Sequence, residues 1–517
     1  MNMLIRDKLI SNTTYLLLDW FFISLISMLF WFIIGKNLLP SSYGIIATSF
    51  QIAQFLSTIC LLGFGSAIRK LIPELLEKKQ KNKIKGLILY SIKIVATFSL
   101  FVAMVLIIFS NQLSNILNLE TRVISVTALL MVMITFTNFF GDIYNGFQKM
   151  KLYFLTDFLG QLTKIIVASF LIVMGFDYFG PIIALLLCFF ITFISRVNKD
   201  FFKISKPIMP DKKRVFNYSI PGFLVAIFLI VFTQTQYIIL NILNTPNTSI
   251  QNKLEITGFF AVALTVSLPI QVIPIILSAA LFPITSGLSV DKSGKTKQNY
   301  LIKLIFRYSL FCILPAAIFL ILNAKHVILF FSKPEYLSAT TLLPYLVFAS
   351  MFYGLGSLLL YNLYAIGEPK KYRDCHLIVT LVYLILAIPL TYYFSGIGLA
   401  ISYLSSTFLL FILGIYLLKK YLAIRLPTSD IVRIVVGVLV SSLFLLLFRP
   451  YIPNFWLAGV FVTMAILIYL LILLKLNFYL EEDLKVLDFL GERSPILKKQ
   501  IIWLKKYLSQ FVTRSYH

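Results

Sequence analysis

The sequence predicts an all-α polytopic membrane protein, and three observations support this prediction. Hydrophobic residues make up 59% of the 517 residues, charged residues make up 13%, and the mean hydropathy is +0.91. A single soluble core cannot bury so many apolar side chains. They fall into stretches of about 20 residues, the length that an α-helix needs to cross a bilayer. A soluble enzyme, a disordered chain and a disulfide scaffold are therefore excluded.

About fourteen transmembrane helices are predicted, and no alternating ten-residue segments suggest a β-barrel. The first is interpreted as a span and not as a signal peptide, because no cleavage-site pattern follows it. The predicted spans are residues 14–35, 42–66, 87–109, 123–146, 152–175, 179–196, 217–243, 256–285, 300–323, 341–365, 375–394, 396–418, 430–448 and 455–475.

The basic residues predict how these spans are oriented. About 35 of the 46 Lys and Arg residues fall in the termini and in every second loop. Such loops stay in the cytoplasm, so a cell-membrane protein with both termini inside is expected. This distribution also explains the net charge of +25 without a nucleic-acid partner. The opposite loops hold only Lys36, Arg122, Lys253, Lys325, Lys333 and Arg449.

The chain contains an internal repeat. Residues 43–47 (Tyr-Gly-Ile-Ile-Ala) open the second span, and residues 257–261 (Thr-Gly-Phe-Phe-Ala) open the eighth, 214 positions later. We therefore expect two six-helix lobes, residues 1–200 and 201–425. An even number of spans preserves orientation, so a pseudo-two-fold axis along the membrane normal would relate the lobes. Chance similarity of short apolar motifs is the alternative.

The C-terminal part lies outside this repeat. Residues 426–476 carry the two extra helices, spans 13 and 14, and residues 477–517 form a cytoplasmic charged tail. Apolar residues recur in the tail at helical spacing. They predict either an amphipathic helix on the inner leaflet or a helix in a solvated tail.

Polar residues recur on single faces of six predicted spans. Polar groups are costly in hydrocarbon, so these faces meet protein or water. One stripe alone is explained by hydrogen bonds between helices. Six stripes arranged by the repeat favour a central hydrophilic cavity. The candidate cavity residues among them are Gln54, Asn138, Asp142, Asn145, Asp157, Gln161, Lys164, Gln234, Asn241 and Gln271.

The intramembrane cations differ in their depth along the predicted spans. Lys164 lies too deep to reach the interface, so it either binds cargo or pairs with Asp157 or Asp142. Lys93 fits a cavity or a snorkelling position equally well, and Arg307 fits a cavity position or an interfacial anchor. Arg69 is a gate candidate near the inner end of span 2.

Signatures of catalysis are missing from the sequence. There is no phosphate-binding loop for ATP, no H-E-x-x-H motif, and no spacing of Cys or His that predicts a metal site or a catalytic residue. No cofactor is expected. The short outer loops favour a carrier over an enzyme.

Six segments match a known family in their order and spacing: residues 38–44 (LLPSSYG), 62–74 (LGFGSAIRKLIPE), 217–221 (NYSIP), 257–263 (TGFFAVA), 281–283 (LFP) and 343–345 (LPY). In these segments the chain resembles the polysaccharide-biosynthesis, O-antigen-type flippases of the multidrug/oligosaccharidyl-lipid/polysaccharide exporter superfamily. The resemblance covers about residues 10–420. One departure concerns span 7, where that family commonly has an Asp-Arg pair and this chain has Gln236-Tyr237. An ion-coupling carboxylate carried over to that position is therefore in doubt.

The resemblance implies two six-helix lobes with two extra helices, alternating access, and a lipid-linked oligosaccharide as cargo. An anionic polyprenyl diphosphate sugar fits a cavity that contains Lys164. Membrane lipids, and glycosyltransferases or a polymerase of the same pathway, are the other expected partners. Two alternatives remain: a cation-coupled drug or metabolite antiporter of the same superfamily, and an integral-membrane glycosyltransferase.

Overall fold

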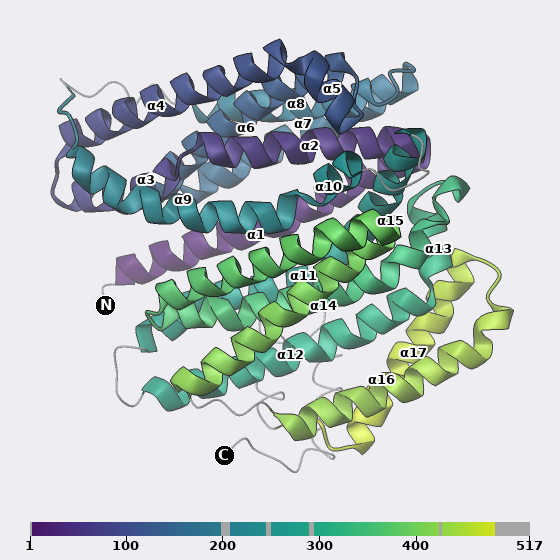
Figure 1. The fold of residues 1–517 in the computed structure, drawn as a ribbon. Coiled ribbons are helices and arrows are strands. Elements are labelled where there is room, and N and C mark those ends of the chain that lie inside the picture. Colours follow the sequence, from purple (N-terminus) through teal and green to yellow (C-terminus); the bar gives the residue numbers. More distant parts are fainter. Residues whose placement is uncertain (1–2, 198–206, 244–249, 289–293, 423–426, 481–517) are drawn as a thin grey trace.

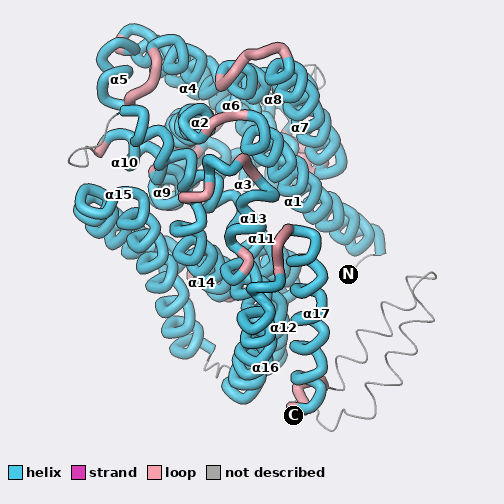
Figure 2. The backbone as a smooth tube through the Cα atoms, turned by 90° about the vertical axis from the view of Figure 1, so that its right-hand side faces the viewer, coloured by secondary structure: helices cyan, strands magenta, loops and turns pink. Residues whose placement is uncertain are grey.

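The computed structural model describes residues 3–197, 207–243, 250–288, 294–422 and 427–480, and the chain within these ranges is helical without a strand (Figures 1 and 2). The predicted amphipathic helix in the tail falls mostly on residues 481–517, which lie outside the described residues.

The first eight helices form the N-terminal bundle (Figure 1). α6 lies at its centre, because it packs against α2, α3, α4 and α8. The bounds are α1 Met3–Asn37, α2 Pro40–Cys60, α3 Phe64–Glu77, α4 Lys81–Ile108, α5 Ser110–Leu117, α6 Thr121–Gly146, α7 Met150–Val173 and α8 Phe179–Arg196.

The C-terminal bundle follows, and two further helices pack beside α12 on its outside. Its helices are α9 Lys212–Gln234, α10 Gln236–Ile242, α11 Ile250–Leu288, α12 Gly294–Leu322, α13 Ala324–Phe331, α14 Ala339–Ala365 and α15 Pro369–Leu422. The added pair is α16 Thr428–Phe448 and α17 Phe455–Lys475, and the 3₁₀ turns are Pro334–Tyr336 and Arg449–Tyr451.

Within the described ranges, thirteen helices are long and apolar enough to cross a membrane, and one of these is a hairpin. α15 has 54 residues, and Ser395 within it has φ 52° and ψ −133°, which is not helical. A Cβ on Gly398 would lie 1.8 Å from the Leu390 carbonyl oxygen, so the chain turns back on itself here. The predicted division between spans 11 and 12 at residue 395 is therefore confirmed.

Two predicted spans contain a break that the sequence analysis missed. The second span divides into α2 and α3 at Leu61–Gly63, where Leu62 and Gly63 have φ of 47° and 72°. The seventh span divides into α9 and α10 at Thr235. A glycine is required at position 63 for two reasons. Its φ is left-handed, and a Cβ there would lie 2.1 Å from the Ser219 carbonyl oxygen on α9.

The two bundles meet mainly along α2 and α11. A Cβ on Gly44 would lie 2.2 Å from the Leu254 carbonyl oxygen, and one on Gly258 would lie 2.0 Å from the Pro40 carbonyl oxygen. Gly44 and Gly258 are equivalent in the sequence repeat. Because α2 also packs on α9 and α1 packs on α11, the contacts are reciprocal, as a two-fold relation would produce.

Successive spans place the loops at two ends of the bundle. The N-terminus and the starts of α4, α7, α9 and α15 lie at the end that we call the basic side, because its described loops carry most of the Lys and Arg (Figure 1). The opposite side holds α5 and α13.

Candidate functional site: the polar interior and a lateral groove

An ion pair is buried inside the N-terminal bundle. Arg196, at the end of α8, is 1% exposed, and its Nη2 lies 2.6 Å from Asp157 Oδ2 on α7. Its Nε donates to Thr156 Oγ1 at 3.1 Å, and its Nη1 donates to the Thr137 carbonyl oxygen at 2.9 Å. The guanidinium carbon lies 4.3 Å from the centre of the Tyr153 ring. Arg196 thus neutralises Asp157 and ties α6, α7 and α8 together.

A second ion pair joins α3 to α6 at the basic side. Arg69 Nη1 lies 3.3 Å from Asp142 Oδ1, and the Arg69 side chain is 54% exposed. Gly65 makes room for the carboxylate, because a Cβ there would lie 1.9 Å from Asp142 Oδ2. Arg69 lies within α3 and holds Asp142, and its role as a gate stays a prediction.

Lys164 has neither of the carboxylate partners that the sequence suggested, since each already pairs with an arginine. Its Nζ donates to Ser27 Oγ on α1 at 3.2 Å and lies 4.8 Å from the centre of the Phe30 ring. The residue is 4% exposed. Among the described residues, no carboxylate lies within ion-pair distance of this ammonium.

A polar contact between the bundles lies toward the opposite side. Gln51 on α2 and Gln236 on α10 meet at 2.9 Å, and Gln51 Oε1 also accepts from the Tyr237 amide at 2.8 Å. Asn241 Nδ2 donates to Thr48 Oγ1 at 2.7 Å. Gln236, which replaces part of the Asp-Arg pair of the resembled family, therefore joins the two bundles.

The same side is also closed by α13 and the turn after it. Tyr336 donates to the Leu38 carbonyl oxygen at 3.2 Å, and Lys36 donates to the Leu329 carbonyl oxygen at 2.8 Å. Burial, reinforced by nearby Glu335 and Asp177, raises the pKa of the Tyr336 hydroxyl well above its ordinary value, so it remains a donor.

We expect Gly44→Leu to weaken closure of this side, because the new side chain would collide with the Leu254 carbonyl group. The measurement is disulfide formation between Gln51→Cys and Gln236→Cys in a protein whose four natural cysteines are serines. Gly44→Leu should reduce cross-linking at least fivefold. Gly459→Leu is the control, since a Cβ there meets no atom within 4 Å. Equal cross-linking in both variants would contradict a close contact at Gly44.

The other predicted cavity residues are amides on the central helices, and they are only partly brought together. Asn138 is exposed although it lies in the middle of α6, between two buried residues. The Oε1 atoms of Gln161 and Gln271 are buried without a hydrogen-bond partner among the described residues. The candidate cavity residues that are partly buried are Gln54, Asn145, Gln161, Gln234 and Gln271.

Two predicted cations lie away from this interior. Arg307 is 1% exposed on α12, where it pairs with Asp430 of α16 at 3.4 Å and donates to the Phe478 carbonyl oxygen at 2.6 Å. It thereby attaches the added helices to the C-terminal bundle. Lys93 lines a lateral pocket at the edge of α4, together with Lys212.

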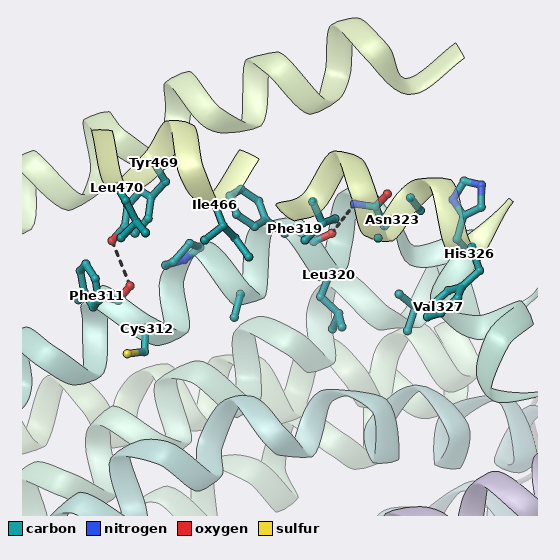
Figure 3. A pocket seen from close by; sticks show the side chains of 16 residues that line it. Phe311, Cys312, Phe319, Leu320, Asn323, His326, Val327, Ile466, Tyr469 and Leu470 are labelled. Atoms are coloured by element: carbon teal, nitrogen blue, oxygen red, sulfur yellow. Dashed lines mark hydrogen bonds between the residues drawn. The ribbon is translucent and has the colours of Figure 1, made fainter. Parts of the chain in front are cut away.

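An apolar groove of about 520 Å³ runs between α12, α13 and α17 (Figure 3). Its middle is lined by residues such as Phe319, Leu320 and Ile466. Polar groups lie at its two ends, where Tyr469 donates to the Phe311 carbonyl oxygen at 3.0 Å and where His326 lies 3.2 Å from the Ile452 carbonyl oxygen. The groove can hold a hydrocarbon chain but offers little to a polar ligand.

Solved structures share this architecture. A lipid II flippase, MurJ, in an inward closed conformation matches with a TM-score of 0.69 at 18% identity, covering 88% of this chain and 97% of that one. An inward-facing multidrug-resistance MATE transporter of the MOP superfamily matches with a TM-score of 0.57 at 17% identity, covering 79% and 96%. An uncharacterized membrane protein of Methanocaldococcus jannaschii is 23% identical over 449 residues, which are 81% of this chain and 85% of the relative.

Two packed helical bundles with a polar interior, in the arrangement of these structures, define a multi-pass membrane protein with the same fold. The model of one family, described as polysaccharide biosynthesis protein, matches residues 9–289, more than half of the chain. The chain belongs to that family.

Proposed function

We propose that this protein is a flippase that moves a lipid-linked, polyprenyl diphosphate oligosaccharide or polysaccharide repeat unit across the cell membrane by alternating access, without ATP hydrolysis. The observation that carries the proposal is a buried ammonium in the N-terminal bundle, with no carboxylate partner among the described residues, together with an apolar groove beside the C-terminal bundle. Such a pair suits a molecule with an anionic head and a long hydrocarbon tail.

The charge pattern favours this cargo over that of a cation-coupled antiporter. Arg196 and Arg69 neutralise Asp157 and Asp142, whereas Lys164 keeps an unneutralised charge among the described residues. A site of this kind attracts a diphosphate and repels a cationic drug. The MurJ match adds support, because that protein is named for a lipid-linked cargo.

We place the basic side in the cytoplasm, as the positive-inside rule requires. With the cytoplasm negative, outward movement of an uncompensated anion is favoured by about 2.3 kcal/mol per charge per 100 mV. Two charges on a diphosphate therefore contribute roughly 4–5 kcal/mol, which makes nucleotide hydrolysis unnecessary.

Gly459→Trp tests the role of the groove. Gly459 lines the groove and has open space around it, so the indole should fill the groove without breaking the helix packing. Purified protein in liposomes should flip a polyprenyl diphosphate oligosaccharide without nucleotide, and Gly459→Trp should reduce the rate at least fivefold. Thermal stability should stay near that of the wild type.

Val460→Trp is the matched control, because Val460 is 53% exposed on the same helix and does not line the groove. It should flip at the wild-type rate. Strict dependence of flipping on ATP would contradict the proposal, and so would transport of a cationic drug in place of the lipid.

A further inference from the structure

A second lateral pocket, of about 610 Å³, lies where the two bundles meet near the basic side. Its wall comes from α4 of the N-terminal bundle and from residues 209–212, which lead into α9. Leu62, in the break between α2 and α3, is also part of the lining. The pocket is separate from the groove beside α17 and from the interior that contains Lys164.

Two ammonium groups face this pocket, and its lining contains no carboxylate. Lys212 Nζ lies 5.9 Å from the centre of the Tyr90 ring on α4, and Lys93 follows Tyr90 by one helical turn. Both lysines are exposed. Asp211, the nearest acid in sequence, lines the neighbouring pocket and caps α9 by accepting from the Arg214 amide.

The depth of Lys93 indicates what fills the pocket. It lies six residues after residue 87, where the predicted span begins, or about 9 Å along the helix. An ammonium at this depth is costly unless it meets an anion or reaches the interface. The pocket continues past Lys93 along apolar side chains to Phe101, which is 55% exposed on the outer face of α4. Cations at the interface and an apolar wall below them match the two parts of a lipid.

We propose that this pocket binds one anionic phospholipid, with the phosphate between Lys93 and Lys212 and an acyl chain against Ile94, Phe98 and Phe101. Lys93 belongs to the N-terminal bundle and Lys212 begins the C-terminal one. The bound phosphate therefore bridges the two bundles beside the contact of Gly63 with α9. The lipid stabilises the conformation in which α3 and α9 are packed together.

The test uses the full-length protein in nanodiscs of phosphatidylcholine with or without phosphatidylglycerol. Native mass spectrometry measures the retained phosphatidylglycerol, and thermal unfolding measures its effect on stability. Lys93→Gln and Lys212→Gln should each weaken retention about fivefold, equivalent to about 1 kcal/mol per cation near an anionic surface. The increase in thermal stability that phosphatidylglycerol produces should fall in the same two variants. Lys93→Arg should retain the lipid and the increase in stability.

Lys370→Gln is the matched control, because Lys370 is an exposed lysine of the basic side that does not line the pocket. It should retain the lipid as the wild type does. Equal retention in all variants would overturn the proposal, and so would an equal loss in Lys370→Gln. A parallel arm replaces phosphatidylglycerol with polyprenyl diphosphate. Retention of that lipid alone, sensitive to Lys93→Gln, would assign the pocket to cargo and overturn the phospholipid assignment.

Discussion

Replacing Arg196 with methionine is expected to destabilise the protein by about 3–5 kcal/mol, the usual consequence of removing one partner from a buried ion pair. The Arg196 side chain is 2% exposed and the Asp157 side chain is 17% exposed. Without the guanidinium, the Asp157 carboxyl group would lose its partner in a site with little water, and Thr156 and the Thr137 carbonyl group would lose their donor. The midpoint of thermal unfolding of the purified protein measures the loss.

The double variant Arg196→Met/Asp157→Asn should recover most of this stability, because it removes both charges. An exposed pair provides the control: Arg373 and Asp374 lie 2.8 Å apart, with side chains 40% and 41% exposed. Arg373→Met should cost about 1 kcal/mol or less. If the double variant is as unstable as Arg196→Met alone, the hydrogen bonds to Thr156 and Thr137 stabilise the site and the ion pair does not.

Arg196 was missed as a site residue because it occupies the last position of a predicted span, where a basic residue is normally an interfacial anchor. A signal was nevertheless present in α8. Leu185, Cys188, Thr192 and Arg196 are spaced by three and four residues and are all buried, so the arginine continues the buried face of the helix. A cation on the apolar face of a span indicates an internal partner.

The pairing of Lys164 with Asp157 or Asp142, one of the two alternatives for this residue, is not found in the structure, and the reason is different. Periodicity places Asp157 and Lys164 on one face of α7, but it gives no information about which side chain of another helix meets each of them. The structure places Arg196 against Asp157, and Arg69 against Asp142. Ser27 and Phe30 of α1 are left to contact Lys164. Such pairings depend on the rotation and offset of packed helices, which one sequence does not contain.

The part of the fold that the bilayer determines, the division of the chain into membrane-spanning helices, was predictable from the sequence. Every backbone polar group must be satisfied in hydrocarbon, so each apolar stretch becomes a helix. The break at Leu61–Gly63 was not predictable from hydropathy, because the apolar pattern continues through it. The break at Thr235 lies in a polar run, residues 233–236 (TQTQ), but polar residues within a span were interpreted as the lining of a cavity and not as a helix end. Gly63 is explained by its left-handed φ and by its close contact with α9, a partner more than 150 residues away in the sequence.

Lys164→Met is expected to separate stability from transport. Burial of an ammonium without a carboxylate costs several kcal/mol, and the weak partners Ser27 and Phe30 offset only part of this cost. Methionine has a similar length and no charge, so the variant should be at least as stable as the wild type. If the ammonium binds the diphosphate, flipping in liposomes should nevertheless fall at least tenfold.

Lys151→Met is the control for Lys164→Met, since Lys151 is an exposed lysine near the start of the same helix. It should change neither stability nor flipping. A stable Lys164→Met protein that flips normally would show that the ammonium does not bind cargo. A strongly destabilised Lys164→Met protein would show instead that the contact with Ser27 holds α1 against α7. Only a stable protein that no longer flips supports Lys164 as the cationic group that receives the diphosphate, because only then does the unfavourable burial of a charge have a function.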